Sequence, residues 1–173
     1  MKRTLTILAL FIIPFISGAQ DVIEDVFKKY SGNDSFTSIV IGKDLLNLAF
    51  SLDNEKNAES LKGKISDLKI LVSNNTLSKK NDSFFTDIKE ALDKNSYLNL
   101  MEIRDGKSKV RIYAKKDNDT ISHLVLIASE DDEEVLLSLR GLFSMKELAE
   151  LGKCSNGDGS FHYLSHLKDV EKQ

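Results

Sequence analysis

The chain has 173 residues, of which 24 are Lys or Arg and 27 are Asp or Glu, so its formal net charge is −3. Charges of both signs are interleaved and no basic block is present, which argues against nucleic acid as a partner. The single cysteine excludes an intramolecular disulfide, so a chain of one-domain length must be stabilised by its apolar core.

The first predicted element is a secretory signal peptide over residues 1–19. Two basic residues precede an apolar run at 5–16, which is too short to span a bilayer comfortably. The small residues at 17–19 end in Ala19 and predict cleavage before Gln20. A lipoprotein carries Cys at that position. Gln20 therefore predicts an exported chain without a stable membrane anchor, soluble in the periplasm or outside the cell.

After the signal peptide, the sequence predicts a single domain over 20–151 and a flexible tail over 152–173. Apolar residues at helical spacing predict helices at 21–30, 44–52, 83–94 and 144–151. Apolar and alternating runs predict strands at 36–41, 68–73, 97–104, 109–115, 121–129 and 135–142. This order favours an α+β fold with a single mixed or antiparallel sheet. The sheet is expected to start β-α-β-α-β, to continue as an antiparallel meander, and to have its helices packed on one face.

Local signals add detail to these elements. Asp105-Gly106 predicts a hairpin turn, and Asn95 is predicted to end a helix in the left-handed conformation. The strand at 121–129 is apolar on both faces and is expected near the centre of the sheet. Ser144 and Glu147 have the spacing of a capping box. One face of the helix at 44–52 carries Leu45, Leu48, Ala49 and Leu52.

Several apolar segments carry a resemblance to a known family. They are FTSIVI at 36–41 before a Leu/Phe-rich helix, LKIL at 68–71, the strand at 97–105 followed by VRIY at 110–113, and LVLI at 124–127. With the last strand and the helix at 145–151, they resemble the Bacteroidetes domain of unknown function four-two-five-two. The resemblance implies small exported proteins, many of them lipoproteins, without an established activity and with a setting in envelope signalling. It supplies no catalytic residues.

The predicted tail contains the best candidate for a metal site. His162 and His166 are four residues apart, so on a helix both imidazoles would point the same way. Cys154 or Asp158 could supply a third ligand. The alternative is a polar tail that happens to contain two histidines. No cofactor is predicted, because the sequence has no nucleotide-binding, zinc-protease or hydrolase motif.

His123 lies in a predicted strand and is either a buried general base or a structural histidine. The acidic run at 130–134 is interpreted as a solvated hairpin turn, with a weak Ca²⁺ site as the alternative. Thr120 lies in an Asp-Thr-Ile pattern that matches a short O-glycosylation signal. A basic strand face is either an ordinary solvated surface or a site for an acidic partner or membrane, and it comprises Lys109, Arg111, Lys115 and Arg104.

Three hypotheses about function follow. The first is a non-enzymatic exported domain that binds another envelope protein, with stress signalling as the expected setting. The second is a small metal- or ligand-binding protein that uses the tail. The third is a hydrolase, which a pocket joining His123 to an acidic residue and a hydroxyl group would support.

Overall fold

The computed structural model describes residues 21–52, 61–74, 82–130 and 133–148. The helices in these ranges are α1 (Val22–Ser31), α2 (Lys43–Leu52), α4 (Asp82–Lys94) and a helical turn at 145–148. The strands are β1 (Phe36–Gly42), β2 (Ile65–Asn74), β3 (Leu98–Asp105), β4 (Ser108–Asp117), β5 (Thr120–Glu130) and β6 (Glu133–Phe143). Every predicted helix and strand is present, and most strands extend a few residues beyond their predicted ends. None of the helices in these ranges is long and apolar enough to cross a membrane.

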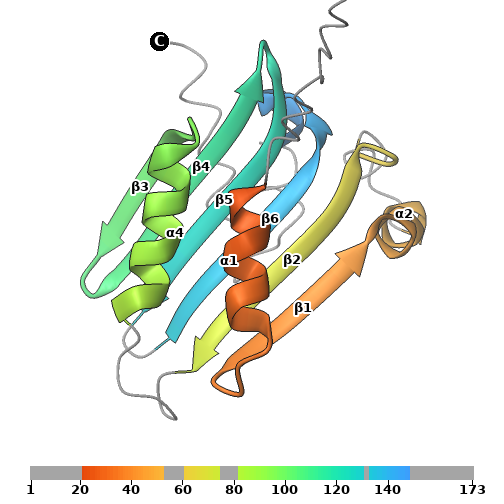
Figure 1. Ribbon diagram of the computed structural model, residues 1–173. Coiled ribbons are helices and arrows are strands. Elements are labelled where there is room, and N and C mark those ends of the chain that lie inside the picture. Colours follow the sequence, from red (N-terminus) through yellow and green to blue (C-terminus); the bar gives the residue numbers. More distant parts are fainter. Residues whose placement is uncertain (1–20, 53–60, 75–81, 131–132, 149–173) are drawn as a thin grey trace, which may run out of the picture.

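The six strands form one antiparallel sheet in the order β1-β2-β6-β5-β4-β3 (Figure 1). Each neighbouring pair is antiparallel, which settles the choice between a mixed and an antiparallel sheet. β5 and β6 occupy the centre, as the apolar sequence of β5 predicts. β1 and β3 are the two edge strands. The α+β fold class is therefore confirmed.

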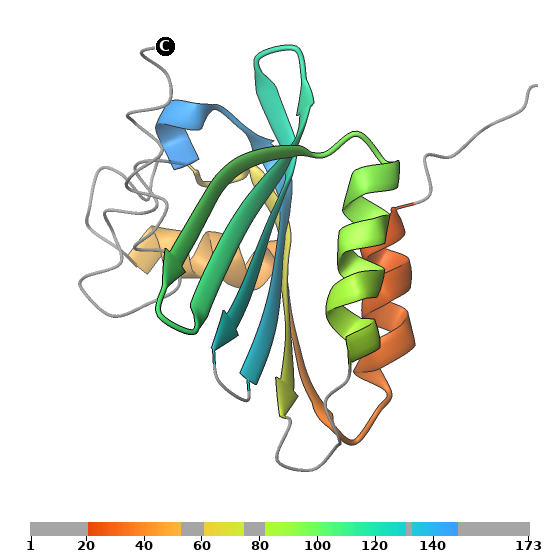
Figure 2. The same cartoon turned by 90° about the vertical axis from the view of Figure 1, so that its left-hand side faces the viewer.

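One face of the sheet is covered by α1 and α4, which lie side by side across it (Figures 1 and 2). Asp21 caps α1, and every third or fourth residue of that helix is buried against the sheet. Tyr30, Phe36 and Phe84 form an aromatic cluster there, with ring centroids 4.9–5.0 Å apart. The core on this face comprises Ile23, Val26, Phe27, Tyr30, Phe36, Leu71, Phe84, Ile88, Leu92, Tyr113, Val125, Ile127 and Leu136.

The opposite face carries a second core, and this corrects the expectation that the helices pack on one face only. α2 and the helical turn at 145–148 lie on this side (Figure 2). The physical reason is that β5 and β6 alternate apolar residues toward both faces, so both faces must be covered. Leu46 of α2 and Leu148 pack there against strand residues that include Ile112, Leu124, Leu126, Leu137 and Leu139.

Local sequence signals predicted some of the turn and cap residues correctly. Asp105 ends β3 and Gly106 follows with φ +58°, as the predicted hairpin requires. Ser144 and Glu147 form the predicted capping box, in which each accepts a hydrogen bond from the backbone N–H of the other. After α4, however, the left-handed residue is Ser96 (φ +58°) and not Asn95. The side chain of Asn95 instead donates to the carbonyl of Ala91 at 2.8 Å.

Candidate functional site

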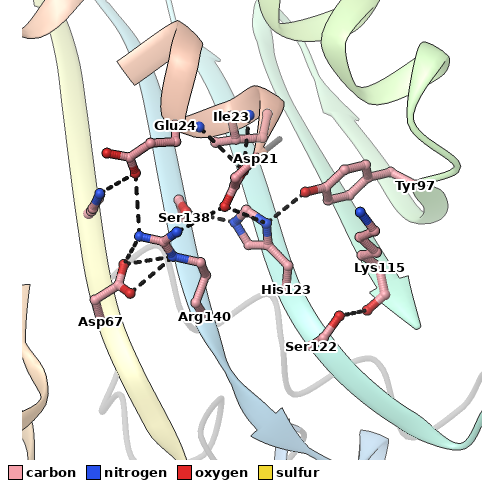
Figure 3. A network of polar contacts seen from close by, with 11 residues as sticks. Asp21, Ile23, Glu24, Asp67, Tyr97, Lys115, Ser122, His123, Ser138 and Arg140 are labelled. Atoms are coloured by element: carbon pink, nitrogen blue, oxygen red, sulfur yellow. Dashed lines mark hydrogen bonds and ion pairs between the residues drawn. The ribbon is translucent and has the colours of Figure 1, made fainter. Parts of the chain in front are cut away.

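A row of polar side chains crosses the sheet on the face that α1 and α4 cover. Arg140 of β6 lies opposite Asp67 of β2 on one side and opposite His123 of β5 on the other. Lys115 of β4 is the next residue in the row and lies opposite His123 of β5. Directly opposite residues of an antiparallel pair share a face, so these four side chains are neighbours. α1 begins above the row at Asp21 (Figure 3).

Asp21 uses its two carboxylate oxygens for different purposes. Oδ1 accepts hydrogen bonds from the backbone N–H groups of Ile23 (3.1 Å) and Glu24 (3.3 Å), which caps α1. Oδ2 accepts from Nη1 of Arg140 at 3.0 Å. The residue that starts the helix therefore also attaches it to the sheet.

Arg140 is the centre of the charged part of the cluster. Its Nε lies 3.0 and 3.1 Å from the two carboxylate oxygens of Asp67, and its Nη2 lies 3.3 Å from Oε2 of Glu24. Lys69 donates a hydrogen bond to the same Glu24 oxygen, and this bond lowers the pKa of Glu24 although burial opposes the shift. The planar guanidinium group suits such multiple pairing with carboxylates. The ion pairs therefore join α1 to β2 and β6.

His123 forms the buried part of the cluster and is only 4% exposed. Its Nδ1 lies 2.6 Å from the hydroxyl of Tyr97, and its Nε2 lies 2.7 Å from Oγ of Ser138. Burial is the main cause that lowers the pKa of His123 to about 4, and the charge of Asp21, 3.9 Å away, opposes the shift. Burial also raises the pKa of Tyr97. At neutral pH the imidazole is therefore uncharged and the phenol keeps its proton.

The hydroxyl of Ser138, the imidazole of His123 and the carboxylate of Asp21 have the composition of a hydrolase triad, but not its contacts. Nδ1 of His123 lies 2.6 Å from the hydroxyl of Tyr97, whereas Oδ2 of Asp21 is 3.9 Å away, beyond hydrogen-bond distance. In a hydrolase triad the carboxylate itself accepts the hydrogen bond from Nδ1 and so orients the imidazole that takes the proton of the serine.

Solvent access to this serine gives a second argument. Ser138 is 3% exposed beneath α1. A cleft of about 410 Å³ is lined by Phe85, Thr86, Lys109, Ser129 and Glu134, and a cleft of about 340 Å³ runs between α1 and α4. Neither of these two clefts includes Ser138 or His123. Within the described residues, the burial and contacts of His123 are those of a structural histidine.

The sequence interpretation missed most members of this cluster. It singled out His123, but not Asp67, Tyr97 or Arg140. A signal was present in β6, where Ser138 and Arg140 alternate with Leu137 and Leu139 beyond the two glutamates that open the strand. Polar residues at every second position of a central strand indicate a polar site on one face of the sheet.

A second candidate site is the apolar surface of α2, which follows the edge strand β1. Seven large apolar side chains are exposed in the described residues, and five of them lie within residues 39–52. Ile39 and Val40 of β1 are 43% and 59% exposed, and as adjacent strand residues they point to opposite faces of the sheet. Three more residues form what we call the α2 stripe, and they are Leu45, Leu48 and Leu52.

The α2 stripe is the apolar face that the sequence identified in this helix, yet it points outward. The helix buries Leu46 in the core instead, and Phe50 packs there with partial exposure. Helical spacing shows which residues share a face, but it does not show which face meets the sheet. The exposed stripe therefore has no role in the described core.

The predicted basic strand face is only partly paired within the chain. Arg104 and Arg111 both donate to Glu102, and Lys109 lies 3.8 Å from it. The hydrogen bonds from Arg104 and Arg111 lower the pKa of Glu102. Lys115 lies over the ring of Tyr97, with Nζ 5.8 Å from its centroid. One carboxylate thus faces three cationic side chains, so this face keeps a net positive charge and an acidic partner stays an alternative.

The remaining predicted site residues are placed as follows. Thr120 is half-buried and opens β5 directly after a turn in which Asn118 has φ +54°. The acidic run lies between β5 and β6, where Glu130 pairs with Glu133. Residues 131–132 lie outside the described residues, and Glu134 is half-buried, so the run is not solvated throughout. Within the described ranges, no group of three or more His, Cys, Asp or Glu side chains is placed to hold a metal ion. The remaining candidates lie outside the described residues, and they are Ala19, Gln20, Cys154, His162 and His166.

Comparison with known proteins gives one result. A search of curated proteins finds no match, and a search of solved structures finds none either. A family model described as "Domain of unknown function (DUF4252)" matches residues 30–151, which include all six strands and most of the described helices. The chain therefore belongs to the DUF4252 family, as its apolar segments predict.

Proposed function

We propose that this protein is an exported, non-enzymatic domain that binds another protein of the cell envelope through the α2 stripe. The observation that carries the proposal is the outward-facing α2 stripe, in which Leu45, Leu48 and Leu52 recur at helical spacing and are 58%, 56% and 73% exposed. Single exposed leucines are ordinary, whereas a concentrated apolar surface is typical of a protein-binding site.

Two further observations support this proposal. The polar cluster around His123 has its hydrogen bonds satisfied internally and its serine buried, which is the arrangement of a structural network. The predicted signal peptide at 1–19 supports export. The family resemblance favours a partner in envelope stress signalling.

A pull-down with the mature chain, residues 20–173, tests the proposal. Envelope extract of the source organism is passed over immobilised wild type, Leu48→Glu and Leu142→Glu. Leu48 lies in the α2 stripe, whereas Leu142 is a similarly exposed leucine in β6 and serves as the matched control. We expect wild type and Leu142→Glu to retain the same protein and Leu48→Glu to lose it. Equal retention by all three chains, or no retention by wild type above background, would refute the proposal.

A further inference from the structure

The last described residues lie beside α2, on the same face of the sheet (Figure 2). Leu148, the last described residue, packs in the core that α2 covers. Two contacts also connect α2 to the last helical turn. The side chain of Asn47 accepts a hydrogen bond from the backbone N–H of Gly63 at 2.8 Å, and the next residue, Lys64, forms an ion pair with Glu147. The chain that follows Leu148 therefore starts next to α2.

This following segment, residues 149–173, differs from the other segments outside the described residues. Residues 53–60 also follow α2, but their sequence DNEKNAES has no large apolar side chain. Residues 1–20 lead into α1 and residues 75–81 into α4, and both of these helices cover the opposite face (Figure 2). Residues 131–132 are two aspartates. The segment that both starts beside α2 and carries large apolar residues is therefore 149–173.

The sequence of residues 161–173, which we call the tail segment, has the pattern of an amphipathic helix. Tyr163, Leu167 and Val170 are spaced by four and three residues, and Leu164 lies beside them on a helix. A helix this short is marginal alone in water, so it forms where its apolar side is buried against another surface. The opposite side of such a helix is polar and comprises His162, Ser165, His166 and Asp169.

The α2 stripe is an apolar surface of the required kind, and it lies within reach of the tail segment. Leu45, Leu48 and Leu52 are spaced by three and four residues, and each is more than half exposed. Residues 149–160 join Leu148 to the tail segment, and a stretch of that length spans up to about 40 Å when extended. A tethered segment meets its site at an effective concentration near the millimolar range, so it needs less intrinsic affinity than a second copy or a free protein.

We infer that the tail segment packs on the α2 stripe as a helix and competes there with the partner protein. The docking buries Leu45, Leu48 and Leu52 against the apolar side of the tail segment and leaves His162 and His166 facing solvent. A partner then binds only the fraction of molecules in which the stripe is open, so the tail segment lowers its apparent affinity. The competition rests on the proposed function, whereas the docking does not.

Thiol alkylation measures the docking in the mature chain, residues 20–173, without any partner. Ala49 is exposed on α2 beside the stripe, so Ala49→Cys in a Cys154→Ser background adds one thiol there and keeps every leucine. With the native tail segment this thiol should react about tenfold more slowly than with Leu167→Glu, which puts a charge on the apolar side. Ser165→Glu makes the same type of change on the polar side and is the matched control, so the rate should stay low. Circular dichroism checks that all three chains fold.

Three alkylation results would overturn the inference. The first is an equal rate in all three chains, and the second is a Ser165→Glu chain that reacts as fast as Leu167→Glu. The third is protection that rises with protein concentration and persists in Leu167→Glu, which would assign the stripe to a second copy.

The competition is tested in the pull-down with the mature chain. Leu167→Glu should retain more of the partner than wild type does, and equal retention by the two chains would overturn the competition. The failure of the docking and the failure of the proposed function are distinguishable, because alkylation involves no partner. A partner held through Leu48 together with equal alkylation rates would overturn the docking and leave the proposed function intact.

Discussion

The buried imidazole of His123 should make the stability of the fold depend on pH. The pKa of this group is about 4 in the folded chain and 6.5 at its ordinary value in the unfolded chain. Between these two values the unfolded chain binds a proton that the folded chain excludes. The stabilising effect is therefore fully present above pH 6.5 and is lost as the pH falls toward 4.

The magnitude follows from the gap between the two pKa values. A difference of about 2.5 between the two pKa values contributes about 3 kcal/mol to the free energy of unfolding. About 2.5 kcal/mol of this contribution is lost between pH 7 and pH 4.5. The lowered pKa of Glu24 acts in the same direction, but its effect begins only near its ordinary value of 4.5. A fall in stability that starts above pH 5 is therefore the signature of His123.

Urea unfolding of the wild type and of His123→Gln at pH 7, 6, 5 and 4.5 measures this effect. The variant cannot take up the proton, so its free energy of unfolding should fall by about 2.5 kcal/mol less than that of the wild type over this range. NMR titration of the wild-type imidazole gives an independent reading, in which the ring signals of His123 should not shift above pH 5. Parallel pH curves for the two chains, or a His123 signal that titrates near pH 6.5, would refute the reasoning.

Two further predictions concern close contacts and capping. A Cβ at Gly141 would lie 2.4 Å from the carbonyl oxygen of Lys64, so Gly141→Ala should destabilise the fold by about 1–3 kcal/mol in urea unfolding. Gly32→Ala, where a Cβ meets no atom within 4 Å, is the control, and equal effects of the two changes would contradict the packing argument. Asp21→Asn keeps a capping oxygen but loses the charge beside Arg140, whereas Asp21→Ala loses both. Asp21→Ala should therefore be less stable than Asp21→Asn by about 1 kcal/mol, and equal melting temperatures would show that the cap contributes nothing.

The sequence was a good guide wherever a structural choice depends on residues close together in the chain. Periodicity identified each helix and strand, and the Ser144–Glu147 spacing identified a cap that the structure contains. The prediction for Asn95 was wrong. Asn95 and Ser96 are adjacent polar residues after α4, and the local sequence does not show which of the two adopts the left-handed conformation. Fold class and element order were therefore predictable, whereas single backbone conformations were less so.

The polar cluster could not be predicted from local patterns. Asp67, His123 and Arg140 are far apart in the sequence and become neighbours only through the register of three strands. The face of α2 that is buried could not be predicted for a similar reason, because the spacing of its apolar residues fits a buried face and an exposed face equally well. Its exposed stripe became visible only when Leu46 was found in the core.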